Sequence, residues 1–244
     1  MIYVYLRKTE DWETHTCSDL LSDSFFGQFT ARVLAKKINA WNSVFSLNYF
    51  KYRSLLKSLS QKTFSNYKIE HSLQKIFDEI TEEDFVLPSD DDDWLAPNIQ
   101  EHLDPKIDIQ YWDCVVLMSN GRTHMWSEYH DNLCSNNYCL SGSCVNKMLK
   151  EDVAKITLML NDHAFVKKAI NKSNLTHRDI QKPLSCYLWH IGSASYMISR
   201  KGPIKEQDKI EEIIVPKDAN WLEEYLEEFA TIHNQIKIKT KLFL

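Results

Sequence analysis

Four consecutive aspartates, Asp90–Asp93, are the residues of this sequence with the clearest capacity for chemistry. Adjacent carboxylates repel one another, and solvent or a cation must offset that repulsion. The run closely follows Phe85–Leu87, whose apolar and aromatic residues predict a short buried strand. Ligands of open α/β sheets bind outside the carboxyl ends of the strands, which is where we expect these carboxylates.

Carboxylate oxygens at such a position suit Mg²⁺ or Mn²⁺, and such a metal is usually shared with substrate phosphates. Alternate residues of an extended segment point to the same side, so Asp90 and Asp92 are expected to face together. Asp91 and Asp93 are then expected to face the other way. The placement leaves two interpretations open, a metal–phosphate site and a solvated surface turn.

Three further residues each have a functional and an ordinary structural interpretation. Asp162 follows an apolar run and opens a helix, where it is either a general base or a helix cap. His190 lies in an apolar, aromatic stretch, where it is either a core histidine or a metal ligand. Trp94 follows the acidic run and either packs in the core or stacks on a sugar.

The cysteine spacing next to His130 is compatible with a zinc site but does not favour one. Cys134, Cys139 and Cys144 recur every five residues, and His130 precedes the first of them by four. This spacing lacks the tight CxxC pair that places two thiolates on one metal, so free thiols are favoured. His130 also belongs to an aromatic and polar cluster, which is either the wall of an acceptor site or ordinary loop packing.

Composition and missing motifs argue against several common enzyme classes. The 244 residues include five glycines, and the sequence contains no GxGxxG, GxxxxGK[ST] or GxSxG motif. Rossmann dinucleotide binding, P-loop chemistry and serine esterase activity therefore lack their usual signatures. A formal charge of −5 does not indicate a nucleic-acid partner, although a nucleic-acid acceptor stays open. No apolar run is long enough to span a membrane, so we expect a cytoplasmic protein.

The elements that must position these residues alternate between strands and helices. Ile2–Leu6 and Ile109–Met118 have the composition of strands, and Lys68–Ile80 has the apolar spacing of a helix. This alternation predicts an α/β fold around a mostly parallel central sheet flanked by helices. The second half of the chain is more irregular. A charged linker, Lys201–Lys217, leads there to a final amphipathic helix with an apolar stripe over 221–232.

The segment FVLPSDDDDWLAP, Phe85–Pro97, resembles the DxD region of GT-A-fold nucleotide-sugar glycosyltransferases. The nearest likeness is to glycosyltransferase family 2 and the rhamnosyltransferases. In those proteins a strand ends in an acidic cluster, and a proline follows the metal-binding aspartate after a few residues. With Pro97 as the anchor, the resemblance places Asp90 and Asp92 at the two DxD positions. It makes Asp92 the best metal ligand.

Three downstream segments extend the resemblance. Leu140–Lys147 is similar to the acceptor-side segment in which a glycine, here Gly142, precedes a helix with basic residues. Leu160–His163 is similar to the region that carries the catalytic base of inverting members, and the matching residue is Asp162. Trp189–Ser195 is similar to a late segment that meets the diphosphate or the metal.

The resemblance therefore implies a full set of site residues. The general base is Asp162, and the metal ligands are Asp92, Asp90 and His190. The donor nucleotide, diphosphate or ribose is contacted by Asp90, Asp91, Arg7, Ser193 and Ser195. The transferred sugar or the acceptor is contacted by Asp93, Trp94, His130 and Gly142.

The implied activity is transfer of a sugar from a UDP-, GDP- or dTDP-sugar to the hydroxyl group of a glycan or another acceptor, with Mn²⁺ or Mg²⁺ as cofactor. A base at Asp162 would give inversion, and a retaining route stays open. The resemblance implies one GT-A-like domain over 1–200, with a donor half in 1–97 and an acceptor half in 98–200. Residues 201–244 are expected to pack on it. Two alternatives stay open: a non-catalytic binding or interaction protein whose acidic turn is either solvated or Ca²⁺-binding, and a sugar nucleotidyltransferase.

Overall fold

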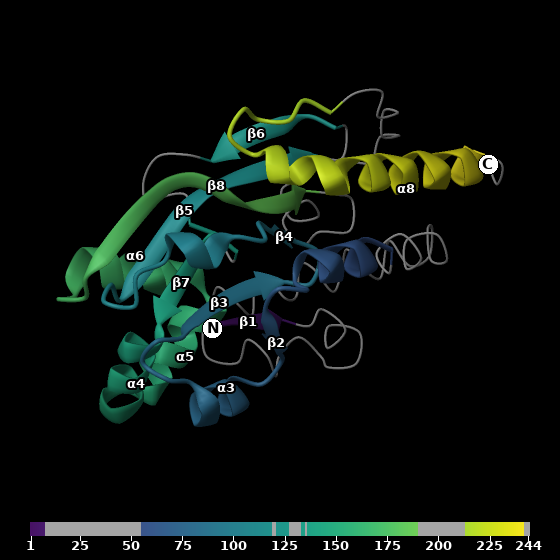
Figure 1. The fold of residues 1–244 in the computed structure, drawn as a ribbon. Coiled ribbons are helices and arrows are strands. Elements are labelled where there is room, and N and C mark those ends of the chain that lie inside the picture. Colours follow the sequence, from purple (N-terminus) through teal and green to yellow (C-terminus); the bar gives the residue numbers. More distant parts are fainter. Residues whose placement is uncertain (8–54, 119–120, 127–132, 135, 190–212, 242–244) are drawn as a thin grey trace.

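The computed structural model describes residues 1–7, 55–118, 121–126, 133–134, 136–189 and 213–241, and Figure 1 shows the fold. Four residues predicted for the site lie outside these ranges: His130, His190, Ser193 and Ser195.

One mixed sheet joins the described strands in the order β2-β1-β3-β7-β5-β8-β4, with β6 paired to β5 (Figure 1). The strands are β1 (Ile2–Arg7), β2 (Lys68–Glu70), β3 (Phe85–Asp90), β4 (Trp94–Leu95), β5 (Ile109–Met118), β6 (Thr123–Trp126), β7 (Tyr138–Ser141) and β8 (His177–Trp189). β1 is parallel to β2 and β3, and β5 is parallel to β8. β7 is antiparallel to β3 and β5, β6 to β5, and β4 to β8.

The α/β class predicted from the sequence is confirmed, but the sheet is mixed rather than mostly parallel. The short strands β4, β6 and β7 each run against the strand they pair with. Strand direction leaves no mark on the composition of segments this short, so the alternation of elements alone could not reveal it.

Helices cover both faces of the sheet (Figure 1). They are residues 55–63, α3 (Leu73–Glu79), α4 (Gly142–Glu151), α5 (Val153–Asn161), α6 (His163–Lys172) and α8 (Glu223–Lys241), with 3₁₀ turns η1 (Ile99–His102) and η3 (Asn220–Leu222). Residues of α3 to α6 share one core cluster with β1, β3, β5 and β7. Residues 55–63 and α8 share another with β4, β5 and β8. Among the described helices, none combines the length and apolar character needed to cross a membrane.

Alternation along β1 determines which side chains face the α3–α6 cluster. Ile2, Val4 and Leu6 belong to the core cluster on the opposite face, whereas Tyr3 belongs to the cluster with α3 to α6. Successive strand residues point to opposite faces, so Arg7 shares the face of Tyr3. The end of β1 therefore directs a cation toward these helices.

The predicted helix Lys68–Ile80 is only partly correct. Lys68–Glu70 forms β2 and pairs with β1, and the helix begins after Ser72, whose Oγ accepts the N–H of Lys75 at 3.4 Å. Lys68–Glu70 contains one apolar side chain, so its pattern is compatible with the period of a helix and with that of a strand. Pairing with β1 in a parallel ladder favours the strand.

The predicted C-terminal amphipathic helix is present as η3 and α8. Leu222, Leu226 and Phe229 of its apolar stripe are buried. Trp94 of β4 packs edge-on against Phe229, with ring centroids 5.8 Å apart, and lies 5.9 Å from the ring of Tyr225. These contacts fasten α8 to the strand that directly follows the four aspartates.

Candidate functional site

The four aspartates form a tight turn between β3 and β4, called here the acidic turn (Asp90–Asp93). β3 ends at Asp90, and the N–H of Asp93 donates to the carbonyl oxygen of Asp90 at 3.4 Å. Arg7, the last residue of β1, is the register partner of Asp90. The acidic turn therefore lies at the carboxyl ends of two adjacent parallel strands, as predicted, and α/β sheets bind ligands at such positions.

Most of the acidic turn is removed from solvent. Asp93 is completely buried, and Asp91 and Asp92 are 6% and 9% exposed. Burying carboxylates is costly unless cations or hydrogen bonds compensate. A solvated surface turn, the structural alternative from the sequence, therefore does not describe this segment.

Two cationic side chains neutralise part of its charge. Arg7 Nη2 lies 2.7 Å from Asp90 Oδ1, and Lys57 Nζ lies 2.8 Å from Asp91 Oδ2. The Lys57 and Asp91 side chains are 19% and 7% exposed, so salt screens this pair less than an ion pair at the surface. The acidic turn is thus anchored to two different elements, strand β1 and the helical residues 55–63.

Asp93 is held in another way. Its Oδ1 accepts the backbone N–H of Leu188 in β8 at 3.3 Å, while Oδ2 receives no hydrogen bond from the described residues. Burial raises the pKa of Asp93 well above its ordinary range, and the charges of Asp92 and Asp90 raise it further. A buried oxygen without a donor is unfavourable, so a proton or a cation at this position would be stabilising.

The donor set can be compared with what a metal ion requires. Within the described ranges, no three acidic, histidine or cysteine side chains are grouped to enclose a metal. Mg²⁺ and Mn²⁺ do not need such a group, because one or two carboxylates plus water and substrate phosphates complete their coordination. Asp93, whose Oδ2 receives no hydrogen bond from the described residues, and Asp92, which precedes it in the acidic turn, are the candidate carboxylates for such a metal. Asp90 fits this role less well than predicted, because Arg7 occupies its Oδ1.

Asp162 lies at the junction of α5 and α6. Its N–H donates to the carbonyl oxygen of Leu158 at 2.8 Å and ends α5, while its Oδ1 accepts the N–H of Ala164 at 2.8 Å and caps α6. The helix start predicted at this position is confirmed. The cap uses one carboxylate oxygen, and Oδ2 has no hydrogen bond from the described residues.

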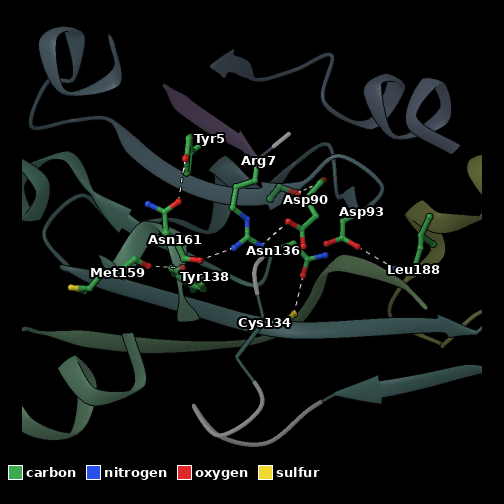
Figure 2. A network of polar contacts seen from close by, with 11 residues as sticks. Tyr5, Arg7, Asp90, Asp93, Cys134, Asn136, Tyr138, Met159, Asn161 and Leu188 are labelled. Carbon is green, nitrogen blue, oxygen red and sulfur yellow. Dashed lines mark hydrogen bonds and ion pairs between the residues drawn. The ribbon is translucent and has the colours of Figure 1, made fainter. Parts of the chain in front are cut away.

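Arg7 brings this junction to the acidic turn, as Figure 2 shows. Its Nη1 donates to the carbonyl oxygen of Asn161 at 2.9 Å, and the Tyr5 hydroxyl donates to Asn161 Oδ1 at 3.2 Å. His163 is close enough for the charges of Arg7 and Asp90 to affect its pKa, although burial is the main cause that lowers it. Arg7, the acidic turn and the junction that carries Asp162 are therefore joined at the carboxyl ends of β1 and β3.

Two predicted substrate residues do not join them. Trp94 is completely buried beneath α8, so neither face of its ring is exposed to a sugar. Gly142 lies at the amino end of β3, where Phe85 pairs with Ser141, at the opposite end of that strand from Asp90. A Cβ on Gly142 would lie 1.8 Å from the carbonyl oxygen of Thr81, so close packing accounts for this glycine.

A buried polar layer that the sequence did not indicate lies close to the acidic turn (Figure 2). Asn136 Oδ1 accepts from Cys134 Sγ at 3.0 Å, and Asn136 Nδ2 donates to the carbonyl oxygen of Cys186 at 3.2 Å. Burial raises the pKa of the Cys134 thiol well above its ordinary range. The described cysteines are free and buried, and the described residues alone form no metal-binding group with them.

Lys57 and Asn161 are the other residues of the site that the sequence did not reveal. Lys57 is one of many lysines, and only the fold brings it to Asp91. Asn161 contributes its backbone carbonyl, and because every residue has such a carbonyl, the residue type gives no indication of this role. Asn161 directly precedes Asp162 in the sequence, and this position was the only indication that Asn161 belongs to the site.

Comparison with protein-family models found none that matches this chain, and comparison with curated proteins found no match in sequence either.

Proposed function

We propose that this chain is a metal-dependent glycosyltransferase, which moves a sugar from a nucleotide-sugar donor to an acceptor hydroxyl. The observation that carries the proposal is the buried acidic turn at the carboxyl ends of β1 and β3, with one carboxylate oxygen of Asp93 left without a donor. The resemblance of Phe85–Pro97 to the DxD region supports it independently of the geometry.

On the donor side, Asp92 and Asp93 would hold the metal. A divalent metal in this position supplies charge neutralisation for the leaving nucleoside diphosphate. Lys57 and Arg7 each offset one carboxylate of the acidic turn, those of Asp91 and Asp90. A divalent cation such as Mn²⁺ or Mg²⁺ would compensate the Oδ2 of Asp93, which receives no hydrogen bond from the described residues.

On the acceptor side, Asp162 would serve as the general base. Its Oδ1 is fixed by the Ala164 amide, which orients the carboxylate and leaves Oδ2 to accept a proton from the acceptor hydroxyl. A hydroxyl deprotonated by a protein carboxylate attacks the sugar from the side opposite the leaving group. We therefore propose an inverting transfer.

The test is the thermal stability of the protein with UDP, GDP or dTDP, each with and without Mn²⁺. We expect one nucleotide to raise Tm only when Mn²⁺ is present, because a ligand that binds the native state stabilises it by mass action. Asp92→Asn should abolish this shift and leave the Tm of the protein without ligands unchanged or slightly higher, since it removes the charge of one carboxylate from a run of neighbouring carboxylates. Asp78→Asn on the exposed surface of α3 is the matched control and should keep the shift.

The remaining outcomes decide against the proposal in distinct ways. Stabilisation by Ca²⁺ with no response to any nucleotide would indicate a non-catalytic protein with a calcium-binding turn. Stabilisation by nucleoside triphosphate together with release of pyrophosphate from a sugar phosphate would indicate a nucleotidyltransferase. An Asp92→Asn variant that keeps the Mn²⁺-dependent shift would remove the acidic turn from the site.

A further inference from the structure

We infer that Arg7 is a positioning residue that fixes the distance between the acidic turn and the Asp162 junction, rather than a contact to the donor nucleotide. Its catalytic consequence rests on the proposed function, whereas its structural consequence does not.

Arg7 uses both terminal nitrogens for contacts within the protein. Nη2 lies 2.7 Å from Asp90 Oδ1, and Nη1 donates to the carbonyl oxygen of Asn161 at 2.9 Å. A guanidinium is planar and presents its donors in a rigid fork, so these two contacts fix the carboxylate and the carbonyl relative to each other. Each terminal nitrogen of Arg7 therefore directs one N–H at a partner within the protein, and the two partners together fix the orientation of the guanidinium.

The carbonyl that Arg7 holds belongs to the end of a helix. The last carbonyls of α5 have no partners within the helix, and the helix dipole makes this end negative. Tyr138 donates its hydroxyl to the carbonyl oxygen of Met159 at 2.7 Å, and Tyr5 donates to the Asn161 side chain at 3.2 Å. Arg7 is the charged member of this set of three (Figure 2).

The residue after Asn161 is Asp162, whose backbone ends α5 and whose side chain caps α6. Moving the Asn161 carbonyl therefore moves the carboxylate proposed as the base. Asp90 at the other end of the guanidinium begins the turn that carries Asp92 and Asp93. One side chain thus spans the two halves of the proposed active site.

Hydrogen exchange tests the structural part without any assay of activity. The amides of Asp162 and Ala164 should exchange about tenfold faster or more in Arg7→Met, because both report on the junction. Arg7→Lys should give an intermediate increase, because lysine keeps the charge at the helix end but cannot hold both partners. Lys62→Met, which breaks the exposed pair with Glu228, is the control and should leave both amides unchanged. Unchanged exchange in Arg7→Met would overturn the inference.

Kinetics separate positioning from nucleotide binding. Arg7→Lys should lower kcat by up to about 100-fold, because small displacements of reacting groups cost that much. Its KM for the donor and its Mn²⁺-dependent affinity for the nucleotide should stay within about threefold of wild type. A large rise in donor KM with kcat retained would overturn the inference and make Arg7 a nucleotide contact. If the wild-type protein transfers no sugar from any donor, the proposed function fails, and the exchange experiment still decides the role of Arg7.

Discussion

Asp162 combines two roles at one residue, since the carboxylate that caps α6 is also the one proposed to take a proton. Asn keeps the cap and removes the base, so Asp162→Asn separates the roles. We expect kcat to fall by about 10²–10⁴-fold, with Tm and donor affinity nearly unchanged. Asp152→Asn is the matched control, because Asp152 caps α5 through the Lys155 amide at 3.0 Å. Near-normal transfer in Asp162→Asn would eliminate Asp162 as the base.

His163, the next residue, gives a prediction about pH. Burial lowers its pKa below the ordinary value of 6.5, so the folded protein binds a proton less readily there than the unfolded chain does. Stability from this residue is therefore fully present above pH 6.5 and is lost as the pH falls below it. In urea titrations between pH 8 and pH 5, His163→Gln should lose less stability than wild type. Parallel pH dependence of the two proteins would show that His163 is protonated equally in both states.

At the scale of elements, Gly142 joins the start of α4 to the segment before β3. Its N–H donates to the carbonyl oxygen of Asp84 at 2.7 Å, and a Cβ would strike the Thr81 backbone. Gly142→Ala should lower the free energy of unfolding by about 1–3 kcal/mol, because the Thr81 backbone cannot change rotamer to make room for the Cβ as a side chain could. Urea unfolding measures this loss. Ser143→Ala, one residue further into the same helix at an exposed position, should be nearly neutral.

The sequence predicted those elements whose signals are local. Ile109–Met118 is a strand with the predicted bounds, since its ten residues are rich in the apolar and aromatic side chains that favour strands. The acidic turn was predicted at the end of a strand because its charges interrupt an apolar run. The ion pairs of Arg7 and Lys57 were not predicted, because each joins segments that only the folded sheet brings together. The division of Lys68–Ile80 was missed for the same reason, since β1 decides it.

At the scale of the whole molecule, α8 is part of the core rather than an appendage. Phe229 is completely buried against Trp94, which directly follows the acidic turn. Phe229→Ala should cost about 3–5 kcal/mol in urea unfolding, the usual range for a buried phenylalanine. It should also weaken Mn²⁺-dependent nucleotide binding, because Trp94 loses its support. Glu227→Ala on the exposed side of α8 should change neither quantity.

The pairing of β1 with β3 has a consequence for synthesis on the ribosome. Ile2 pairs with Phe85 and Arg7 with Asp90, so β1 is translated long before its partner strand exists. At roughly 5–20 residues per second, this apolar strand waits for several seconds with both edges unpaired. The end of the sheet that carries the acidic turn therefore forms late, and nascent chains that stop before β3 should be the species most prone to aggregate. Pulse-labelled chains released at position 80 should be insoluble, whereas chains released at position 244, which include α8, should be soluble.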